Sequence, residues 1–315
     1  MKIVKDSATA TLLPEESYNG LEDETLVRNS SPSPTITAMD KNGAPGREPV
    51  QISFTAASNR SMRRWLGAVV CLCLVLLAGC GNGTGPAPTN WQYTALGDSL
   101  AVGVLDSQGG YVRRYDNDIT TDTGVTVSLT DLGVNGAHSG DLLKSLEKDP
   151  TFRSDVSASQ VVTWDIGGDD LLHAINLFRN GQCGGADNQN CLRSAVAAFM
   201  PNWDAIVLQI LAFRDKNQTI IRTMDIYNPF VAQLMVEGTF STVEPYLDQV
   251  NQHIAASAKA KGIPMAQVHL AFNGPNGDQD PVAKGLITVD GVHPTDNGHK
   301  VIADALRALG YGPLK

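Results

Sequence analysis

The sequence is short of charge, and the charge it has is mostly of one sign. Only 18% of its 315 residues are charged, and acidic side chains outnumber basic ones by 33 to 24. Nucleic acid and anionic lipid surfaces both attract basic patches, so this balance argues against binding to either through charge. The acidity belongs to the second part of the chain: residues 1–79 hold eight side chains of each sign, whereas residues 80–315 hold 16 basic and 25 acidic ones.

The chain also lacks the short motifs of several enzyme classes. It has no Gly-rich phosphate loop, no zincin helix and no dinucleotide-binding fingerprint. Its five cysteines form no CxxC pair and no cluster with histidine, which are the patterns that hold zinc. The sequence therefore predicts a protein that works without a metal or another cofactor.

The first 80 residues do not read as part of a folded domain. Residues 1–61 are rich in Ser, Thr, Pro, Asn and charge, without a sustained apolar period, and are expected to be disordered. Two arginines after Met62 precede an apolar run over residues 66–78, which ends at Gly79 and Cys80. A charged start, a 13-residue apolar centre and small residues before a cysteine are typical of a secretory signal. The run is shorter than the roughly 20 residues that span a bilayer. An internal membrane anchor or a buried core helix is the alternative interpretation.

Residues 77–80 (LAGC) resemble the lipobox of bacterial lipoproteins, in which the signal is cleaved before a cysteine that then carries lipid. The resemblance implies that Cys80 is lipidated and that the protein is exported and anchored to the bacterial cell membrane. A signal must be N-terminal, so Met62 is then the true start and residues 1–61 are an upstream extension.

This interpretation divides the chain into four parts. They are a disordered extension (1–61), a lipoprotein signal peptide (62–79), a flexible Gly/Pro-containing tether (80–90) and a single folded domain (91–315). The two cysteines left in the domain, Cys183 and Cys191, are eight residues apart in a Gly/Asn-rich loop. In an oxidising compartment they would close a small disulfide loop; two free thiols are the alternative.

Five apolar, strand-like runs alternate with helical stretches in the domain. Continuous apolar runs are typical of strands covered on both faces, and the alternation predicts a parallel sheet with helices on both sides. Ligands bind beyond the carboxyl ends of the strands in such sheets, so motifs at strand ends carry the most weight. The five runs are residues 91–96, 125–132, 161–166, 219–227 and 263–270.

Four short motifs lie at such ends or before the last helix. Residues 97–100 (GDSL) follow the first run and place Ser99 where a helix can begin. Residues 135–140 (NGAHSG) follow the second run, and residues 167–171 (GGDDL) follow the third. Residues 290–294 (DGVHP) place a carboxylate three residues before a histidine, which could orient the imidazole. Each motif alone is also ordinary turn chemistry.

In this order the four motifs resemble those of the SGNH/GDSL hydrolases, a family of esterases and lipases. The resemblance covers most of the domain and implies a flavodoxin-like three-layer α/β/α sandwich with a five-stranded parallel sheet. It assigns the nucleophile to Ser99 and completes a catalytic triad with Asp290 and His293. It also implies that the backbone N–H groups of Ser99 and Gly136, together with residue 169, form the oxyanion hole.

The sequence departs from the family at Asp169, where the family has an asparagine in its Gly-x-Asn-Asp block. An amide can donate a hydrogen bond to a developing oxyanion, whereas an ionised carboxylate can only accept one and repels the charge. The departure puts catalytic efficiency in question and leaves the fold prediction unchanged.

The residues themselves point to the same chemistry. A serine hydroxyl is a weak nucleophile that needs an adjacent base, and histidine accepts and returns a proton near neutral pH. An aspartate lies three residues before His173, His293 and His299. The resemblance assigns the base to His293, whose block precedes the last helix. His138 and His173 could touch substrate near the mouth of the site. The other three are expected to be structural, with His299 at the surface or in packing; they are His253, His269 and His299.

The sequence therefore predicts a monomeric serine esterase or lipase that acts on a small-molecule or lipid ester through an acyl-Ser99 intermediate. Two alternatives have the same fold. One is a catalytically weak module that binds acylated glycans or lipids, which Asp169 would permit, and the other is an acyltransferase.

Overall fold

A five-stranded sheet forms the centre of the domain in a computed structural model whose described residues are 89–315. Neighbouring strands pair in the order β2-β1-β3-β4-β5, and every pairing is parallel. The expectations for the extension, the signal, Cys80 and most of the tether lie outside the described residues. The strands are β1 (Asn90–Gly97), β2 (Thr126–Gly133), β3 (Val161–Trp164), β4 (Ile220–Met224) and β5 (Met265–Ala266).

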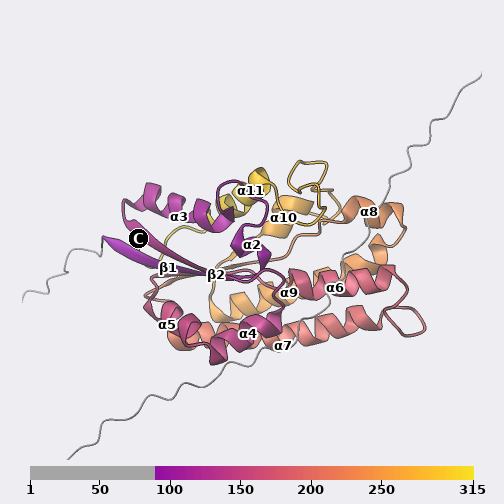
Figure 1. Cartoon of the computed structure of the whole chain (residues 1–315), viewed down its shortest axis with the longest axis horizontal. Helices are drawn as coiled ribbons and strands as arrows, with labels where there is room; N and C mark the ends of the chain where they lie inside the picture. Colours follow the sequence, from indigo (N-terminus) through magenta and orange to yellow (C-terminus); the bar gives the residue numbers. More distant parts are fainter. Residues whose placement is uncertain (1–88) are drawn as a thin grey trace, which may run out of the picture. The chain divides into compact units, whose positions relative to one another are not determined.

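Helices cover both faces of the sheet, which confirms the predicted three-layer α/β/α sandwich (Figure 1). A separate cluster of buried apolar side chains fills the space between the sheet and each helical layer. One layer contains α4 (Ser139–Lys148), α5 (Pro150–Ala158), α6 (Gly168–Arg179), α7 (Asn190–Phe213) and α9 (Phe240–Lys261). The other contains α3 (Gly110–Thr123), α10 (Val268–Asn273) and α11 (Asp296–Arg307). Two short helices, α2 (Ser99–Val102) and α8 (Val231–Val236), follow β1 and β4.

The apolar runs became strands because burial on both faces favours them. Every residue of β3 and β4 is buried, while β2, at the edge of the sheet, is buried only in part. Both β3 and β4 end earlier than the apolar runs that predicted them, and the chain beyond each strand lines the candidate site.

The fifth strand is shorter than expected, and the second half of its run is helical. Residues 263–270 were expected to form a strand, but β5 has only two residues and α10 begins at Val268. Val268 and Phe272 are 1% and 0% exposed, while Leu270 is 46% exposed. A strand would place Val268 and Leu270 on the same face, whereas residues four apart share a face of a helix. The core contacts of Val268 and Phe272 therefore select the helix.

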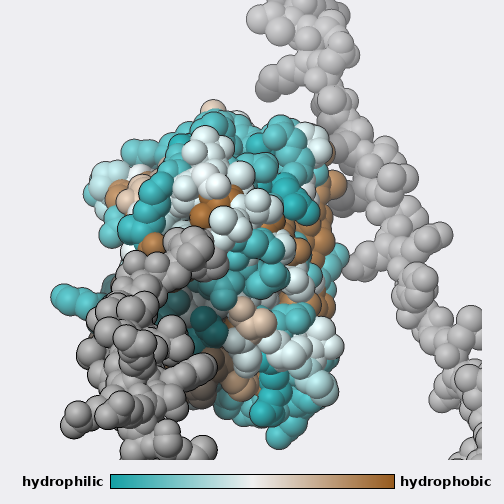
Figure 2. All heavy atoms as spheres, turned by 90° about the vertical axis from the view of Figure 1, so that its left-hand side faces the viewer, coloured by the Kyte–Doolittle hydropathy of each residue, from teal (hydrophilic) through white to brown (hydrophobic). Residues whose placement is uncertain are grey.

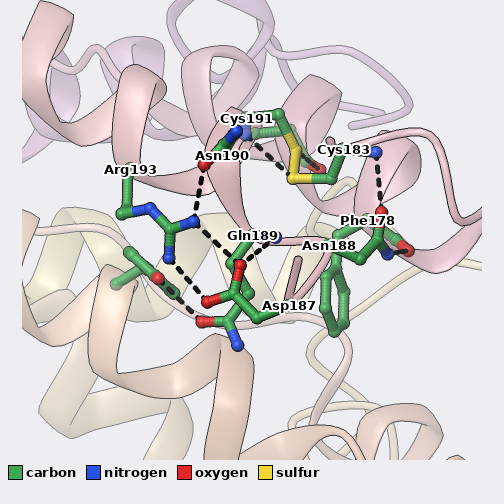
Figure 3. The surroundings of a disulfide bond; sticks show 10 residues. Phe178, Cys183, Asp187, Asn188, Gln189, Asn190, Cys191 and Arg193 are labelled. Carbon is green, nitrogen blue, oxygen red and sulfur yellow. Dashed lines mark hydrogen bonds and ion pairs between the residues drawn. A yellow bond between two sulfur atoms is a disulfide. The ribbon is translucent and has the colours of Figure 1, made fainter. Parts of the chain in front are cut away.

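The disulfide predicted in the loop between α6 and α7 is present and joins Cys183 to Cys191 (Figure 3). The amide side chain of Asn188 ties this loop together, because its Oδ1 accepts the Cys183 N–H at 2.9 Å and its Nδ2 donates to the Phe178 carbonyl at 2.7 Å. Arg193 adds two hydrogen bonds to the Asp187 carboxylate, at 2.9 and 2.8 Å. The loop is thus held by covalent and polar contacts, and Cys183 also packs in the apolar core.

Within residues 89–315, α7 is the one helix that is long and apolar enough to cross a bilayer by length and composition. It contacts α4, α6 and α9 and buries Phe199, Trp203 and Ile206 against the sheet, so its apolar face is explained by packing inside the domain. Figure 2 shows the side of the domain on which the C-terminus lies, where hydrophilic residues predominate and hydrophobic ones are scattered.

Candidate functional site

The segment after β1 presents Ser99 as the first residue of α2. The Asp98 side chain caps this helix by accepting the Leu100 N–H at 2.9 Å, and Ser99 is 8% exposed. Gly97 ends the strand with a φ of 149°, and a Cβ there would lie 2.5 Å from Oδ1 of Asp165. Only glycine lets the backbone come this close to Asp165, which explains the glycine of the GDSL segment.

The structure brings Ser99 together with His293 and Asp290. Nε2 of His293 lies 2.9 Å from Oγ of Ser99, and Nδ1 of His293 lies 2.6 Å from Oδ2 of Asp290. The other carboxylate oxygen of Asp290 accepts hydrogen bonds from the Thr288 hydroxyl and from the N–H groups of Val292 and His293, at 2.6, 2.9 and 3.0 Å. Partial burial opposes ionisation of Asp290, but these hydrogen bonds outweigh it and lower its pKa below the usual range. Asp290 is therefore a carboxylate throughout the neutral pH range.

Gly136 lies in the loop after β2, close in the fold to the end of β1. The strands pair Gly97 with Gly133, and the Val134 N–H donates to the Gly97 carbonyl at 3.0 Å. Gly136 is exposed with a φ of 76°, and nothing lies within 4 Å of where its Cβ would be. Its backbone is thus open to a ligand at the strand end, and a left-handed φ favours glycine there.

The two aspartates that begin α6 have different surroundings. Asp170 accepts two hydrogen bonds from Ser139, from its N–H at 2.8 Å and from its hydroxyl at 2.7 Å, and so fixes the start of α4. Asp169 is half-buried, and burial together with the charge of Asp170 raises its pKa, against the opposing effect of His138 and His293. The carboxylate of Asp170 is therefore hydrogen-bonded to Ser139. Asp169 instead lines the same cavity as His293.

A buried carboxyl pair lies directly behind Ser99, and the sequence motifs did not reveal it. Asp98 and Asp165 are each 3% exposed; Asp165 accepts a hydrogen bond from the Asp98 N–H at 3.3 Å and another from the Tyr111 hydroxyl. Burial raises the pKa of Asp165 to about 6, and burial with the Asp165 charge raises the pKa of Asp98 well above its usual range. Two buried carboxyls in contact share a proton at neutral pH. The one available signal was an aspartate inside the apolar run 161–166.

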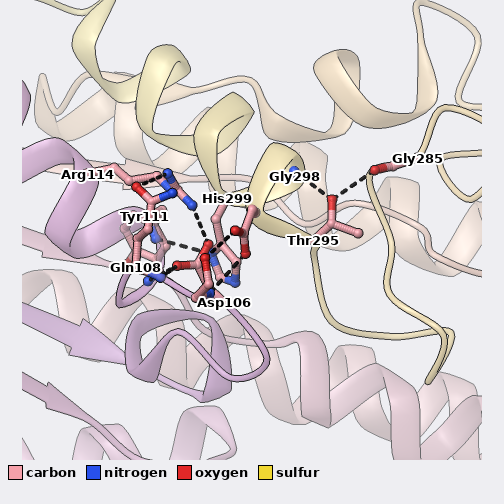
Figure 4. A network of polar contacts seen from close by, with 11 residues as sticks. Asp106, Gln108, Tyr111, Arg114, Gly285, Thr295, Gly298 and His299 are labelled. Carbon is pink, nitrogen blue, oxygen red and sulfur yellow. Dashed lines mark hydrogen bonds and ion pairs between the residues drawn. The ribbon is translucent and has the colours of Figure 1, made fainter.

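A second polar network joins the loop after α2 to α11 (Figure 4). The Asp106 carboxylate accepts the Gly110 N–H at 3.0 Å and pairs with Arg114 at 2.6 Å. The neighbouring Ser107 N–H donates to Asp296 at 2.9 Å. Because Asp296 opens α11 shortly after His293, these contacts tie the loop beside the nucleophile to the segment that carries the base.

His299, also in this network, is fully buried, which selects packing from the two placements predicted for it. Its Nδ1 accepts the Tyr111 N–H at 3.1 Å. Burial first, and then the charge of Arg114, lower its pKa to about 4 against the opposing effect of Asp106, so the ring is neutral at physiological pH.

The remaining histidines make no hydrogen bond to Ser99. His253 contacts Asp204 at 3.2 Å and His269 contacts Glu244 at 3.3 Å, as expected for structural residues. His138 and His173 are exposed, and neither lines a cavity at the site. No group of three or more His, Cys, Asp or Glu side chains in the described part of the chain could hold a metal ion.

A cavity of about 80 Å³ opens beside Ser99 and His293. Apolar side chains dominate its walls and come from α6, α9 and the segment after β4. The arrangement therefore combines a hydroxyl, an imidazole and a carboxylate in hydrogen-bonded sequence with an apolar space next to the hydroxyl.

Known proteins share this architecture. Residues 95–301 match the GDSL-like lipase/acylhydrolase family. The spore germination lipase LipC of Bacillus licheniformis is 26% identical over 228 residues, which cover 71% of this chain and 98% of that protein. The lipase Lip_vut3 from a goat rumen metagenome superimposes with a TM-score of 0.60 at 25% identity, over 71% of this chain and 100% of that one. The acetylxylan esterase Axe2 of Geobacillus stearothermophilus, with a TM-score of 0.52 at 17% identity over 71% and 96%, shares the fold.

Proposed function

Because this chain belongs to the GDSL-like lipase/acylhydrolase family, we propose that it hydrolyses carboxylic esters (EC 3.1.1) through an acyl-enzyme on Ser99. One observation carries the proposal: the hydrogen-bonded series from Asp290 through the His293 ring to Oγ of Ser99, with contacts of 2.6 and 2.9 Å. Ser99 and His293 are 194 residues apart in the chain, so ordinary turn chemistry does not account for their contact.

In the proposed acylation step, Oγ of Ser99 attacks the ester carbonyl carbon while Nε2 of His293 takes the hydroxyl proton. The carbonyl electron pair moves to oxygen, and its return expels the alcohol oxygen, which takes the proton back from His293. Water then attacks acyl-Ser99 with the same base, and a carboxylic acid leaves. Asp290 holds the imidazole in the tautomer whose Nε2 is free to accept, and it stabilises the imidazolium.

The oxyanion would be stabilised by the backbone N–H groups of Ser99 and Gly136, which follow the neighbouring strands β1 and β2. Asp169 takes the place of the third donor. It can donate only while protonated, and its raised pKa extends that state toward neutral pH. We therefore propose that this esterase has two permanent oxyanion donors and one that depends on pH.

The assignment of Ser99 is tested with the Ser99→Ala variant on p-nitrophenyl esters. Loss of more than 95% of activity with unchanged thermal unfolding is the expected result, because the acyl-enzyme cannot form. Substantial residual hydrolysis by a folded variant would reject Ser99 as the nucleophile. His293→Ala should lose a similar share, since triad members act as a unit.

Asp169 also favours a second candidate function, that of a weakly catalytic module that binds acylated ligands. A fluorophosphonate probe separates the two, because it labels a serine that is activated by a neighbouring base. Stoichiometric labelling that disappears in Ser99→Ala supports the esterase. A folded wild-type protein that stays unlabelled supports the binding module.

We further propose that the protein is exported and carries lipid on Cys80. The disulfide between Cys183 and Cys191 supports export, because disulfides persist in oxidising compartments. Expressed from Met62 in a bacterial host, the protein should be cleaved before Cys80 and recovered with membranes, whereas Cys80→Ala should not be lipidated. An unmodified Cys80 in the mass spectrum of the mature protein would reject the anchor.

A further inference from the structure

Two cavities lie side by side at the site and have a common wall. The inner pocket, about 80 Å³, is the one that Ser99 and His293 line. The outer pocket, about 460 Å³, is lined by other parts of α6, by α8 and by the segment before His293, which includes Asp290; neither Ser99 nor His293 lines it. Four residues line both cavities and form what we call the partition: Leu172, Pro229, Phe230 and Val292.

The inner pocket has the character of a site for a hydrocarbon chain. Apolar residues of two helices line much of it, among them Ile175 on α6 and Val243 and Leu247 on α9. A volume of about 80 Å³ holds roughly five to eight groups the size of a water molecule or a methylene. An acyl chain attached to Ser99 would therefore fill the inner pocket after about five to eight carbons.

The partition is held in place by polar contacts beneath it. The Phe230 N–H donates to Oδ1 of Asn228 at 2.8 Å. Asn228 is 3% exposed, its Nδ2 donates to Glu244 at 2.5 Å, and its N–H donates to Asn273 at 2.8 Å. On the other side, Leu172 lies on α6, one turn after Asp169. The partition therefore joins two anchored elements and is not a loose loop.

We propose that the partition, chiefly through Leu172 and Phe230, limits the substrates to esters of acyl chains of about five to eight carbons. The inference rests on the proposed esterase activity and names its substrate class. Shorter chains leave part of the inner pocket empty, and longer ones collide with the partition. Removing either side chain joins the two pockets and gives a longer chain a path into the outer one.

The test is the chain-length profile of kcat/KM for p-nitrophenyl esters from acetyl to tetradecanoyl. In the wild type, each added methylene should raise kcat/KM about fourfold until the inner pocket is full, because burial of a methylene is favourable by that factor. The value should then fall beyond about eight carbons. Phe230→Ala and Leu172→Ala should continue the rise to ten or more carbons.

Two further variants test the same idea: one should shorten the preferred acyl chain, and the other is a matched control that should not change it. Val243→Phe fills the inner pocket from α9 and should move the optimum to four carbons or fewer. Phe178→Ala removes a partly buried phenylalanine from α6 that lines neither pocket, so it should leave the profile unchanged. A wild-type optimum at twelve or more carbons would overturn the proposal. So would a profile that moves no more in Phe230→Ala and Leu172→Ala than in Phe178→Ala.

Binding separates a failure of this inference from a failure of the proposed function. Hexanol and dodecanol carry alkyl chains of different length and no charge. An alcohol that binds the pocket should raise the melting temperature of the folded Ser99→Ala protein, so pocket binding can be measured without catalysis. Hexanol should stabilise this protein whether or not Phe230 is present, whereas dodecanol should do so only once Phe230→Ala is added. If dodecanol stabilises the Ser99→Ala protein equally with and without Phe230→Ala, the role proposed for the partition is refuted, even if ester hydrolysis is observed.

Discussion

Replacing Asp169 with asparagine should make the enzyme faster in alkaline solution, which is unusual for a change at an active site. Two demands conflict in the wild-type protein. His293 must be neutral to act as the base, whereas Asp169 must be protonated to donate to the oxyanion. Burial and the charge of Asp170 raise the pKa of Asp169, so its protonated form persists to higher pH than for an exposed aspartate. Activity should therefore decline as pH rises and Asp169 loses its proton.

The size of the effect follows from the number of donors. With Asp169 ionised, the backbone N–H groups of Ser99 and Gly136 remain, and one donor of three is lost. Loss of one oxyanion donor costs about 2.7–4 kcal/mol, or 10²–10³ in kcat. Asp169 is only half-buried, and solvent screens its charge, so the expected gain for Asp169→Asn near pH 8 is about 10- to 100-fold.

The assay is the pH–rate profile of kcat from pH 5 to 9 on one p-nitrophenyl ester, for both proteins. Asp169→Asn should keep the acid limb and lose the alkaline decline. Asp170→Asn is the matched control, because it removes a neighbouring charge and the Ser139 anchor without supplying a donor at position 169. It should not raise kcat at pH 8. Superimposable wild-type and Asp169→Asn curves, or a fall in kcat on substitution, would refute the role given to Asp169.

Three further changes have defined outcomes. Asp290→Asn should lower kcat by several orders of magnitude yet leave more activity than Ser99→Ala, because it leaves the nucleophile and oxyanion donors in place; equal loss in both would contradict this. Asp165→Asn removes one member of the buried carboxyl pair. Both members have raised pKa values, so their protonated forms stabilise the wild type at low pH and that stability is lost as pH rises through about 6 and above. Thermal unfolding from pH 5 to 9 should therefore slope downward in the wild type and flatten in the variant, and parallel curves would contradict it. Cys183→Ser opens a loop of about nine residues and should cost about 2.5 kcal/mol of folding free energy. That corresponds to a melting temperature lower by roughly 5–10 °C with kcat unchanged, as measured by calorimetry and a single-substrate assay; an unchanged melting temperature would contradict it.

The features that the sequence predicted well are those that depend on short stretches of chain. The runs that became β1 and β4 are mainly apolar, which predicted buried strands, although Gln92 of β1 is exposed and Arg222 of β4 is buried. Asp290 and His293 are three residues apart, and their contact is made within one turn of chain. The disulfide likewise closes a loop of eight residues. In each case the relevant geometry is local.

The fifth strand and the buried carboxyl pair show where local reasoning ended. The run 263–270 is too short for its apolar positions to distinguish a strand, with a period of two residues, from a helix, with a period of 3.6. Only the packing of Val268 and Phe272 selects the helix. The contact between Asp98 and Asp165 joins residues 67 apart, across the pairing of β1 with β3. No spacing within the chain encodes such a contact, because it exists only once the strands are in register.

The sequence by itself determined the layered fold, the order of the motif segments along the chain and the identity of the candidate nucleophile, base and carboxylate. Only the tertiary structure decided how close Ser99 and His293 come, which of two adjacent aspartates has a structural partner, and where the inner pocket ends. The reason is physical: local patterns fix which residues face the core, whereas distances and cavity walls arise from elements such as α6 and α8 that meet only after the whole sheet has formed.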